Sequence, residues 1–265
     1  MPNTQVAIHG AAGRMGQRLI ALGHTDKNLE LCAALEHSGH SQFGKDAGVI
    51  AGIGEIGLPL TDTPPSGTDA LIDFSVPEAT DAVIDLCLSQ KIALVMATTG
   101  LSDVQQEKLR DAANSIAVVW APNMSLAVNL TMKLATIAAD ALKDYASGVD
   151  VEIIERHHRF KEDSPSGTAL KFGELIAGVM GQTTFAHGRE GRPGVRPQHE
   201  IGYHAVRVGD NPGEHTILFG MLGETIELRV GATNRDCYAL GALTAARFAA
   251  TQNPGMYNMY DVLGL

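Results

Sequence analysis

A glycine-rich turn near the start of the chain constrains the fold more than any other feature of the sequence. The segment GAAGRMG follows a short apolar strand at Gln5–His9 and opens a helix over Met15–Gly23, after which a second strand runs over Leu29–Glu36. A strand, a glycine-rich turn, a helix and a second strand in this order are typical of dinucleotide-binding domains. The sequence therefore predicts an α/β chain that begins with such a domain.

Strands and helices alternate through the rest of the first half. Apolar runs predict strands at 70–74, 92–97 and 116–120, and helices at 78–90 and 102–113. Strands that alternate with helices pair in parallel through right-handed crossovers. Residues 38–65 are rich in Gly, Ser and Pro, and we expect a long surface loop there.

The pattern changes near Asn123. We expect a helix over 125–145, a strand over 149–155 and a helix over 166–180, then antiparallel strands over 203–209, 214–220 and 224–232, and a last Ala-rich helix over 236–251. We therefore predict a dinucleotide-binding domain over residues 1–125, to which residues 237–265 return. Residues 126–236 are predicted to form an α+β domain with a mixed, largely antiparallel sheet.

Charge and cysteine content exclude several classes of function. The formal net charge is −10 over 265 residues, and a strongly acidic chain is a poor non-specific binder of nucleic acid, which is bound through an excess of Lys and Arg. Three scattered cysteines argue against a disulfide framework and a zinc site. No secretory signal or membrane-spanning apolar run is visible, so we expect a soluble, cytoplasmic protein that does not bind membranes.

The glycines of the turn suit a cofactor phosphate. Gly10 permits the tight turn, Gly13 lets the backbone approach a pyrophosphate, and Gly16 allows the helix to pack closely on the strand. The helix N-terminus offers amides and partial positive charge to the same anion. An ordinary βα turn remains the alternative, but Glu36 ends the second strand where an acid bonds the ribose hydroxyls.

The residues beside Glu36 bear on the choice between NADH and NADPH. His37 follows the acid, where an enzyme that prefers NADPH usually places Arg, and Glu36 itself would repel a 2′-phosphate. Arg14 in the glycine turn could supply some positive charge instead. We expect NADH to be used at least as well as NADPH. Two more strand ends, at 74–75 and 97–100, point to the same crevice.

A basic segment, ERHHRFKEDSPSGT over residues 155–168, carries the candidate chemistry. His157 and His158 are adjacent in an extended stretch, so their side chains point to opposite sides. Lys161 lies four residues after His157. A solvated basic loop is the plain alternative, and metal binding is disfavoured because the pair lacks zinc-ligand spacing, so we expect no metal. The density of bases favours proton transfer to a small anion.

The same segment ends in a helix start. Ser164 can cap the helix, and Pro165 suits its first position. The amides of Gly167 and Thr168 then have no acceptor within the helix. A capped helix without a ligand is common, but these amides and the Thr168 hydroxyl suit a substrate carboxylate.

With these residues in place, the chain resembles the dihydrodipicolinate reductase family (4-hydroxy-tetrahydrodipicolinate reductases). The pattern E-x-H-H-x-x-K-x-D-x-P-S-G-T-A over residues 155–169 looks like the signature of that family. The resemblance extends to GAAGRMG, to DFSVPE at 73–78, to TTG at 98–100, to APNMS at 121–125 and to GEHT at 213–216. It therefore covers nearly the whole chain.

The resemblance implies a Rossmann domain and a substrate domain that builds a homotetramer. It implies reduction of (2S,4S)-4-hydroxy-2,3,4,5-tetrahydrodipicolinate, a small dicarboxylate, by NADH or NADPH with loss of water, in lysine and diaminopimelate biosynthesis. By position, His157 and Lys161 would be catalytic, and His158, Gly167 and Thr168 would bind substrate. The residues expected around the cofactor are Gly10, Ala11, Ala12, Gly13, Arg14, Met15, Glu36, His37, Ala97, Thr98, Thr99, Ala121, Pro122, Asn123 and Met124.

The chain departs from the pattern of the family at two positions, and two other functions remain as alternatives. Many relatives have Gly where this chain has Ala97, and Arg where it has His37; both positions concern cofactor fit. A different Rossmann dehydrogenase, of the aspartate or homoserine type, would share the glycine turn but would not explain the basic segment. A regulatory module that senses NAD(H) would need no cluster of proton donors.

Overall fold

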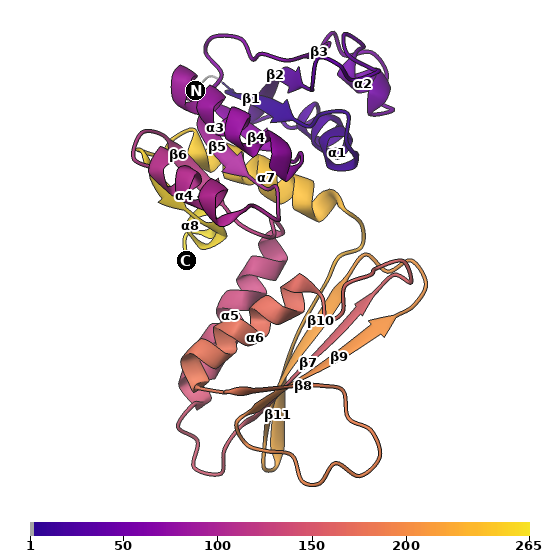
Figure 1. The fold of residues 1–265 in the computed structure, drawn as a ribbon, viewed down its shortest axis with the longest axis vertical. Helices are drawn as coiled ribbons and strands as arrows, with labels where there is room; N and C mark the ends of the chain where they lie inside the picture. The colour runs from indigo at the N-terminus through magenta and orange to yellow at the C-terminus, as the bar shows by residue number, and fades with distance from the viewer. Residues whose placement is uncertain (1–2) are drawn as a thin grey trace. The chain divides into compact units, whose positions relative to one another are not determined.

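The computed structural model describes residues 3–265, and the chain divides into two compact units (Figure 1). The first unit comprises the chain up to Leu126 together with Arg235–Leu265, and the second comprises Ala127–Asn234. Among the described residues, no helix is both long and apolar enough to cross a membrane.

A parallel sheet of seven strands forms the centre of the first unit. Its strands are β1 (Thr4–His9), β2 (Leu29–Leu35), β3 (Leu60–Thr61), β4 (Ala70–Asp73), β5 (Ala93–Met96), β6 (Ala117–Trp120) and β12 (Gly255–Tyr257). They lie in the order β12-β6-β5-β4-β1-β2-β3, so the direction of winding reverses between β1 and β4. In such sheets, ligands bind at that reversal, outside the carboxyl ends of the strands.

Helices cover both faces of this sheet (Figure 1). They are α1 (Arg14–Gly23), α2 (Ala47–Ile50), the 3₁₀ turn η1 (Pro77–Ala79), α3 (Thr80–Gln90), α4 (Asp103–Ala112), α7 (Asp236–Ala249) and α8 (Met259–Leu263). The sheet has a separate hydrophobic core on each face, and successive residues of a strand point into different cores. Ile8 packs in the core with α1 and α7, and Ala7 packs in the core with α3 and α4. The central strands β4 and β5 are buried along their whole length and are almost entirely apolar because helices cover both faces, which confirms the predicted Rossmann architecture.

Residues 38–65 hold more regular structure than the predicted surface loop. They include α2 and the edge strand β3, and Ala47 and Leu60 are buried. The carboxylate of Asp46 organises the segment, because it accepts the amides of Gly48, Val49, Ile56 and Leu58. A short polar turn with one organising acid carries little periodic signal in a sequence, and the loop prediction was therefore incomplete.

A mixed sheet of five strands forms the second unit, with α5 (Leu126–Leu142) and α6 (Gly167–Met180). The strands are β7 (Asp150–His157), β8 (Thr184–His187), β9 (Glu200–Arg207), β10 (Glu214–Met221) and β11 (Glu224–Gly231), in the order β11-β10-β7-β9-β8. The mixed sheet was predicted, but β9 was wrongly expected to be antiparallel: it pairs in parallel with β7 and with β8. The four residues of β8 are too few to give a pattern.

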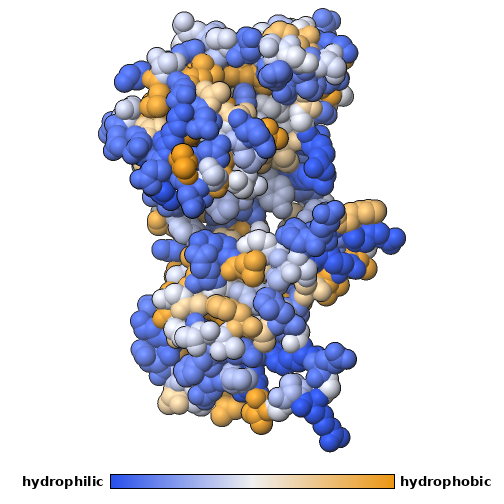
Figure 2. Space-filling model, viewed as in Figure 1, coloured by the Kyte–Doolittle hydropathy of each residue, from blue (hydrophilic) through white to orange (hydrophobic). Residues whose placement is uncertain are grey.

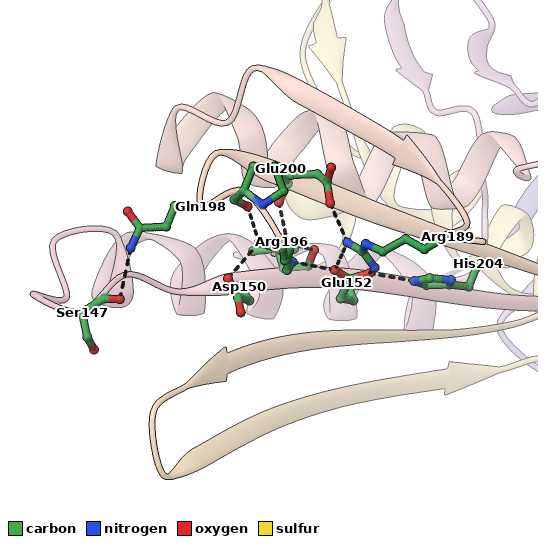
Figure 3. A network of polar contacts seen from close by, with 10 residues as sticks. Ser147, Asp150, Glu152, Arg189, Arg196, Gln198, Glu200 and His204 are labelled. Atoms are coloured by element: carbon green, nitrogen blue, oxygen red, sulfur yellow. Dashed lines mark hydrogen bonds and ion pairs between the residues drawn. The ribbon is translucent and has the colours of Figure 1, made fainter. Parts of the chain in front are cut away.

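An ion-pair network fastens residues 188–199, which connect β8 to β9, to strand β7 (Figure 3). Arg189 donates to both carboxylate oxygens of Glu152 and to Glu200, and Arg196 donates to Glu152 and to Asp150. Burial alone would raise the pKa of Glu152, but the bonds from Arg189, Arg196 and His204 lower that pKa to about 2. The face of the molecule in Figure 2 shows hydrophobic residues only in small groups among hydrophilic ones.

Candidate active site

The glycine turn sits at the reversal of the first sheet and admits no side chain at two positions. Gly10 has φ +74°, and a Cβ there would lie 2.8 Å from the carbonyl oxygen of Phe74. A Cβ at Gly16 would overlap the carbonyl oxygen of Gly10. α1 starts at Arg14, within the segment GAAGRMG and directly after its cap Gly13, so its first amides lie at the crevice without acceptors in the helix.

A cavity of about 550 Å³ opens beside this turn. It is lined by Gly13, Arg14, Met15, Phe74, Ser75, Ala97, Thr98, Thr99, Pro122, Asn123, Met124 and Tyr238. The structure thus brings together nine residues expected around a cofactor, from three separate parts of the sequence. Tyr238 was not predicted as a site residue: it lies in the first turn of α7, and a single tyrosine in an Ala-rich helix carries no signal of a site.

The other expected cofactor residues surround the turn without lining the cavity. Gly10 and Ala11 donate their amides to the carbonyl of Leu35 at 3.0 and 3.1 Å, and Ala121 is buried. Glu36 accepts the amide of Ala12 at 3.1 Å, so the carboxylate lies against the glycine turn. Nδ1 of His37 accepts the amide of Gly39 at 3.1 Å, which leaves Nε2 as its available donor.

A buried carboxylate that sequence reasoning missed ties three strand ends together at the cavity. Asp73 is fully buried at the end of β4 and accepts hydrogen bonds from Ser75 Oγ at 2.6 Å and Thr98 Oγ1 at 2.7 Å. Nδ1 of His9, at the end of β1, lies 2.7 Å from the same carboxylate. Asp73 therefore sets the positions of Ser75 and Thr98. Its signal in the sequence is an acid that ends an apolar strand.

The second unit gathers the predicted bases at the end of β7. His157 is 7% exposed, on the face that carries the buried Val151 and Ile153, and His158 directly follows the strand. Nδ1 of His158 is buried and has no hydrogen-bond partner among the described residues. Buried polar atoms are normally paired, so this nitrogen has a hydrogen-bonding position that no side chain among the described residues uses. Lys161 Nζ lies 2.7 Å from Asp163 Oδ1.

Side chains from its own strand and from two neighbouring strands surround His157. Its Nδ1 lies 2.5 Å from Oε2 of Glu155, a buried carboxylate that Arg207 of β9 holds with two further bonds. The ring of His215, from β10, is T-shaped against the His157 ring at 5.2 Å between centroids. Burial lowers the pKa of His157, although Glu155 opposes that effect. Glu155, Arg207 and His215 were not predicted as site residues.

Helix α6 begins beside these histidines, but its cap differs from the prediction. Ser166, not Ser164, is the N-cap: its hydroxyl accepts the amide of Ala169 at 3.1 Å, and the helix starts at Gly167. Pro165 therefore precedes the cap. Both serines suit a cap by residue type, but only the hydroxyl of Ser166 reaches an amide of the first turn. Gly167 and Thr168 occupy that first turn of the helix.

The buried histidine next to His157 predicts an acid-sensitive fold. Burial, and then the nearby His157, lower the pKa of His215 from 6.5 to about 4. Below pH 6.5 the unfolded chain takes up a proton that the folded chain does not bind, so the free energy of unfolding falls as the pH drops from 6.5 to 4. The expected loss is about 3 kcal/mol from His215 alone, because each tenfold change in proton affinity corresponds to about 1.4 kcal/mol.

Urea unfolding, followed by circular dichroism at a series of pH values, measures this dependence. The variant His215→Gln should lose stability less steeply between pH 6.5 and 4, whereas His199→Gln, at an exposed histidine, should follow the wild type. Equal slopes for wild type and His215→Gln would contradict the assignment. The low pKa of Glu152 adds a second loss between pH 4.5 and 2, because the unfolded carboxylate is protonated first.

Comparison with known proteins covers both units of the chain. The family description "Dihydrodipicolinate reductase, N-terminus" matches residues 4–124, and "Dihydrodipicolinate reductase, C-terminus" matches residues 127–263. A 4-hydroxy-tetrahydrodipicolinate reductase of Rhodopirellula baltica is 58% identical, over 98% of this chain and 96% of that protein. One of Alkalilimnicola ehrlichii is 48% identical over 99% of both chains.

Solved structures show the same arrangement of elements. A dipicolinate-bound dihydrodipicolinate reductase from Paenisporosarcina sp. TG-14 is similar with a TM-score of 0.78 and 26% identity, over 98% of this chain and 99% of that one. An amine dehydrogenase from Mycobacterium smegmatis shares the fold alone, with a TM-score of 0.65 and 11% identity over 97% and 95% of the two chains.

Proposed function

This chain belongs to the dihydrodipicolinate reductase family, and from that premise we propose which residues perform its reaction. The enzyme reduces 4-hydroxy-tetrahydrodipicolinate to tetrahydrodipicolinate with a nicotinamide cofactor, in lysine and diaminopimelate biosynthesis. One observation carries the assignment of the substrate site: the buried carboxylate of Glu155 bonds both His157 and the amide of Ser166, which brings the base at the end of β7 to the start of α6.

The crevice of the first unit fits a dinucleotide. Its turn accepts only glycine at Gly10 and Gly16, so the backbone can approach a pyrophosphate, and the first amides of α1 face the same space. The remaining residues proposed to hold the cofactor are those expected from the sequence, with Tyr238 added from the cavity wall. When bound, the reduced nicotinamide supplies the hydride.

We expect catalytic efficiency with NADH to equal or exceed that with NADPH. Glu36 lies against the glycine turn, where its carboxylate accepts ribose hydroxyls and repels a 2′-phosphate. His37 offers one ring nitrogen, because its other nitrogen already accepts the amide of Gly39. Steady-state measurement of kcat/KM with both cofactors tests this expectation. His37→Arg should shift the ratio toward NADPH, and a strong NADPH preference of the wild type would refute it.

The reaction requires a proton as well as a hydride. Loss of water from the hydroxylated ring leaves a conjugated C=C–C=N system, and hydride adds to the ring carbon that carried the hydroxyl. The electron pair moves to the ring nitrogen, and the neighbouring carbon then takes a proton. In sum, substrate, NADH and one proton give product, NAD⁺ and water. His157 and Lys161 are the proposed proton donors, because an acid or base positioned near a reacting carbon accelerates such transfers.

The two carboxylates of the substrate need cationic and amide partners. We assign them to His158, to the amides of Gly167 and Thr168, and to the partial positive charge at the start of α6. The relative from Paenisporosarcina sp. TG-14, whose structure holds dipicolinate, supports a small dicarboxylate as the ligand class.

Oxidation of NADH with freshly generated 4-hydroxy-tetrahydrodipicolinate tests the function directly. Absorbance of NADH should fall only when protein and substrate are both present. An amino-acid dehydrogenase of another kind would oxidise or reduce its cofactor with aspartate or homoserine instead. A sensing module would bind NADH without consuming it. Either of those results would overturn the assignment.

We also propose a homotetramer that uses the face of the second sheet opposite its buried core. Ile154 of β7 lies between the buried Ile153 and Glu155, so it is on that face. Val206 of β9 pairs with Arg156, two residues from Ile154, and is therefore on the same face; Ile154 and Val206 are 39% and 41% exposed. Exposed apolar groups on a sheet are typical of an interface. Light scattering should give the mass of four chains, and Ile154→Arg with Val206→Arg should lower it. A monomeric wild type would contradict the proposal.

A further inference from the structure

Glu155 is a charged side chain buried beside the proposed proton donor. It is 1% exposed, and its carboxylate accepts four hydrogen bonds. Oε1 accepts from Ser166 N at 3.1 Å and from Arg207 Nη2 at 2.7 Å. Oε2 accepts from Arg207 Nη1 at 2.7 Å and from His157 Nδ1 at 2.5 Å. Both oxygens are therefore fully paired, as a buried carboxylate requires.

This bond determines which nitrogen of His157 is available. An ionised carboxylate only accepts hydrogen bonds, so Nδ1 of His157 must carry a hydrogen. The other nitrogen, Nε2, is then the atom that gains or loses a proton. No hydrogen bond among the described residues uses Nε2, and a Cβ at Gly213 would lie 2.8 Å from it. Glycine at position 213 thus leaves space beside the reactive nitrogen.

The same carboxylate also fixes the start of α6. Ser166 donates its amide to Glu155, and its hydroxyl caps the helix and lies 2.9 Å from Nε2 of His215. Glu155 therefore sets the position of His157 relative to the amides of Gly167 and Thr168.

We propose that Glu155, clamped by Arg207 and the Ser166 amide, is a positioning residue that holds His157 with Nδ1 protonated and Nε2 free to exchange a proton with the substrate. The proposal rests on the proposed function, because it concerns how His157 serves that reaction. It adds two residues, Glu155 and Arg207, that act through His157.

Charges around His157 make the proposal testable. Four titratable or charged groups face its ring: Glu155 from its own strand, Arg207 from β9, His215 from β10 and Lys161 from the segment after β7. Burial lowers the pKa of His157, Glu155 raises it, and Lys161 and Arg207 lower it. Loss of the Glu155 charge must therefore lower this pKa, and loss of the Arg207 charge must raise it.

Two variants should therefore shift the pH dependence in opposite directions. In Glu155→Gln, kcat should fall roughly 10- to 100-fold with little change in the KM for NADH. The limb of the plot of kcat against pH that reports ionisation of His157 should shift to lower pH by roughly one unit. In Arg207→Gln the same limb should shift to higher pH. Glu155→Asp, which keeps the charge, should restore the wild-type limb, and Glu174→Gln on the exposed side of α6 should change nothing. A purely structural role of Glu155 would lower activity without moving the limb.

NMR of the histidine side chains of the wild-type protein gives a test that needs neither substrate nor variant. Long-range proton–nitrogen correlations identify which ring nitrogen carries the hydrogen, and neutral His157 should carry it on Nδ1. A hydrogen on Nε2, or unshifted pH profiles in both variants, would overturn the proposal. A wild type that shows the Nδ1 form but does not oxidise NADH with the substrate would refute the proposed function and leave the geometry of His157 intact.

Discussion

Replacement of His157 by glutamine is expected to lower kcat by roughly 10²- to 10⁴-fold while NADH binding is unchanged, because general acid–base groups typically contribute that much. Glutamine keeps an amide that can donate to Glu155, so the buried carboxylate stays paired, but it cannot exchange a proton. His157 lies in the second unit, whereas the proposed cofactor residues lie in the first. Turnover should therefore fall without loss of cofactor affinity.

Steady-state kinetics with 4-hydroxy-tetrahydrodipicolinate and a separate fluorescence titration with NADH measure the two quantities. His199→Gln is the matched control, because it makes the same substitution at an exposed histidine of the same unit. Wild-type turnover in His157→Gln would remove this histidine from the chemistry. An equal loss in His199→Gln would show that the effect is not specific to the site.

Replacement of Lys161 by methionine is the second large change, and we expect kcat/KM for the substrate to fall roughly 10²- to 10³-fold. The ammonium is proposed to assist the proton transfer, and its positive charge also attracts a dicarboxylate substrate, so kcat and KM should change together. Methionine preserves much of the length of the side chain and removes only the charge and the donors. Asp163, now held 2.7 Å from Nζ, is largely exposed and can be solvated instead.

Lys171→Met provides the comparison for that variant. Lys171 also pairs with an acid, Glu174, at 2.8 Å, but it lies on α6 away from the segment that follows β7. Its loss should leave kinetics unchanged, because exposed ion pairs of this kind contribute little. Full activity in Lys161→Met would mean that His157 alone handles the proton.

Local sequence patterns predicted much of the fold, and non-local pairing limited the rest. The strand at Gln5–His9 and the helix that follows it are readable because apolar spacing and glycines act over a few residues. The pairing partner of β9 could not be predicted from the sequence, because the same alternating pattern suits a parallel or an antiparallel neighbour. The turn organised by Asp46 was missed for a similar reason: its bonds reach amides up to twelve residues away.

The site divides in the same way. Candidate residues within one motif, such as His157 and Lys161, could be chosen by residue type and spacing. Residues that act through contacts across strands could not: Glu155 meets Arg207 from 52 residues away, and His215 comes from a further strand. Glu155 begins the basic segment and was visible as an acid, but only its burial and its four hydrogen bonds give it a role.

Transfer of deuterium from labelled NADH tests the central claim most directly. The wild-type protein is incubated with 4-hydroxy-tetrahydrodipicolinate and NADH that carries deuterium at the transferred position, and the product is examined by mass spectrometry and NMR. We predict one deuterium per product molecule, on the ring carbon that carried the hydroxyl group. Product without deuterium, or labelled NADH left unconsumed by folded protein that binds it, would contradict the account.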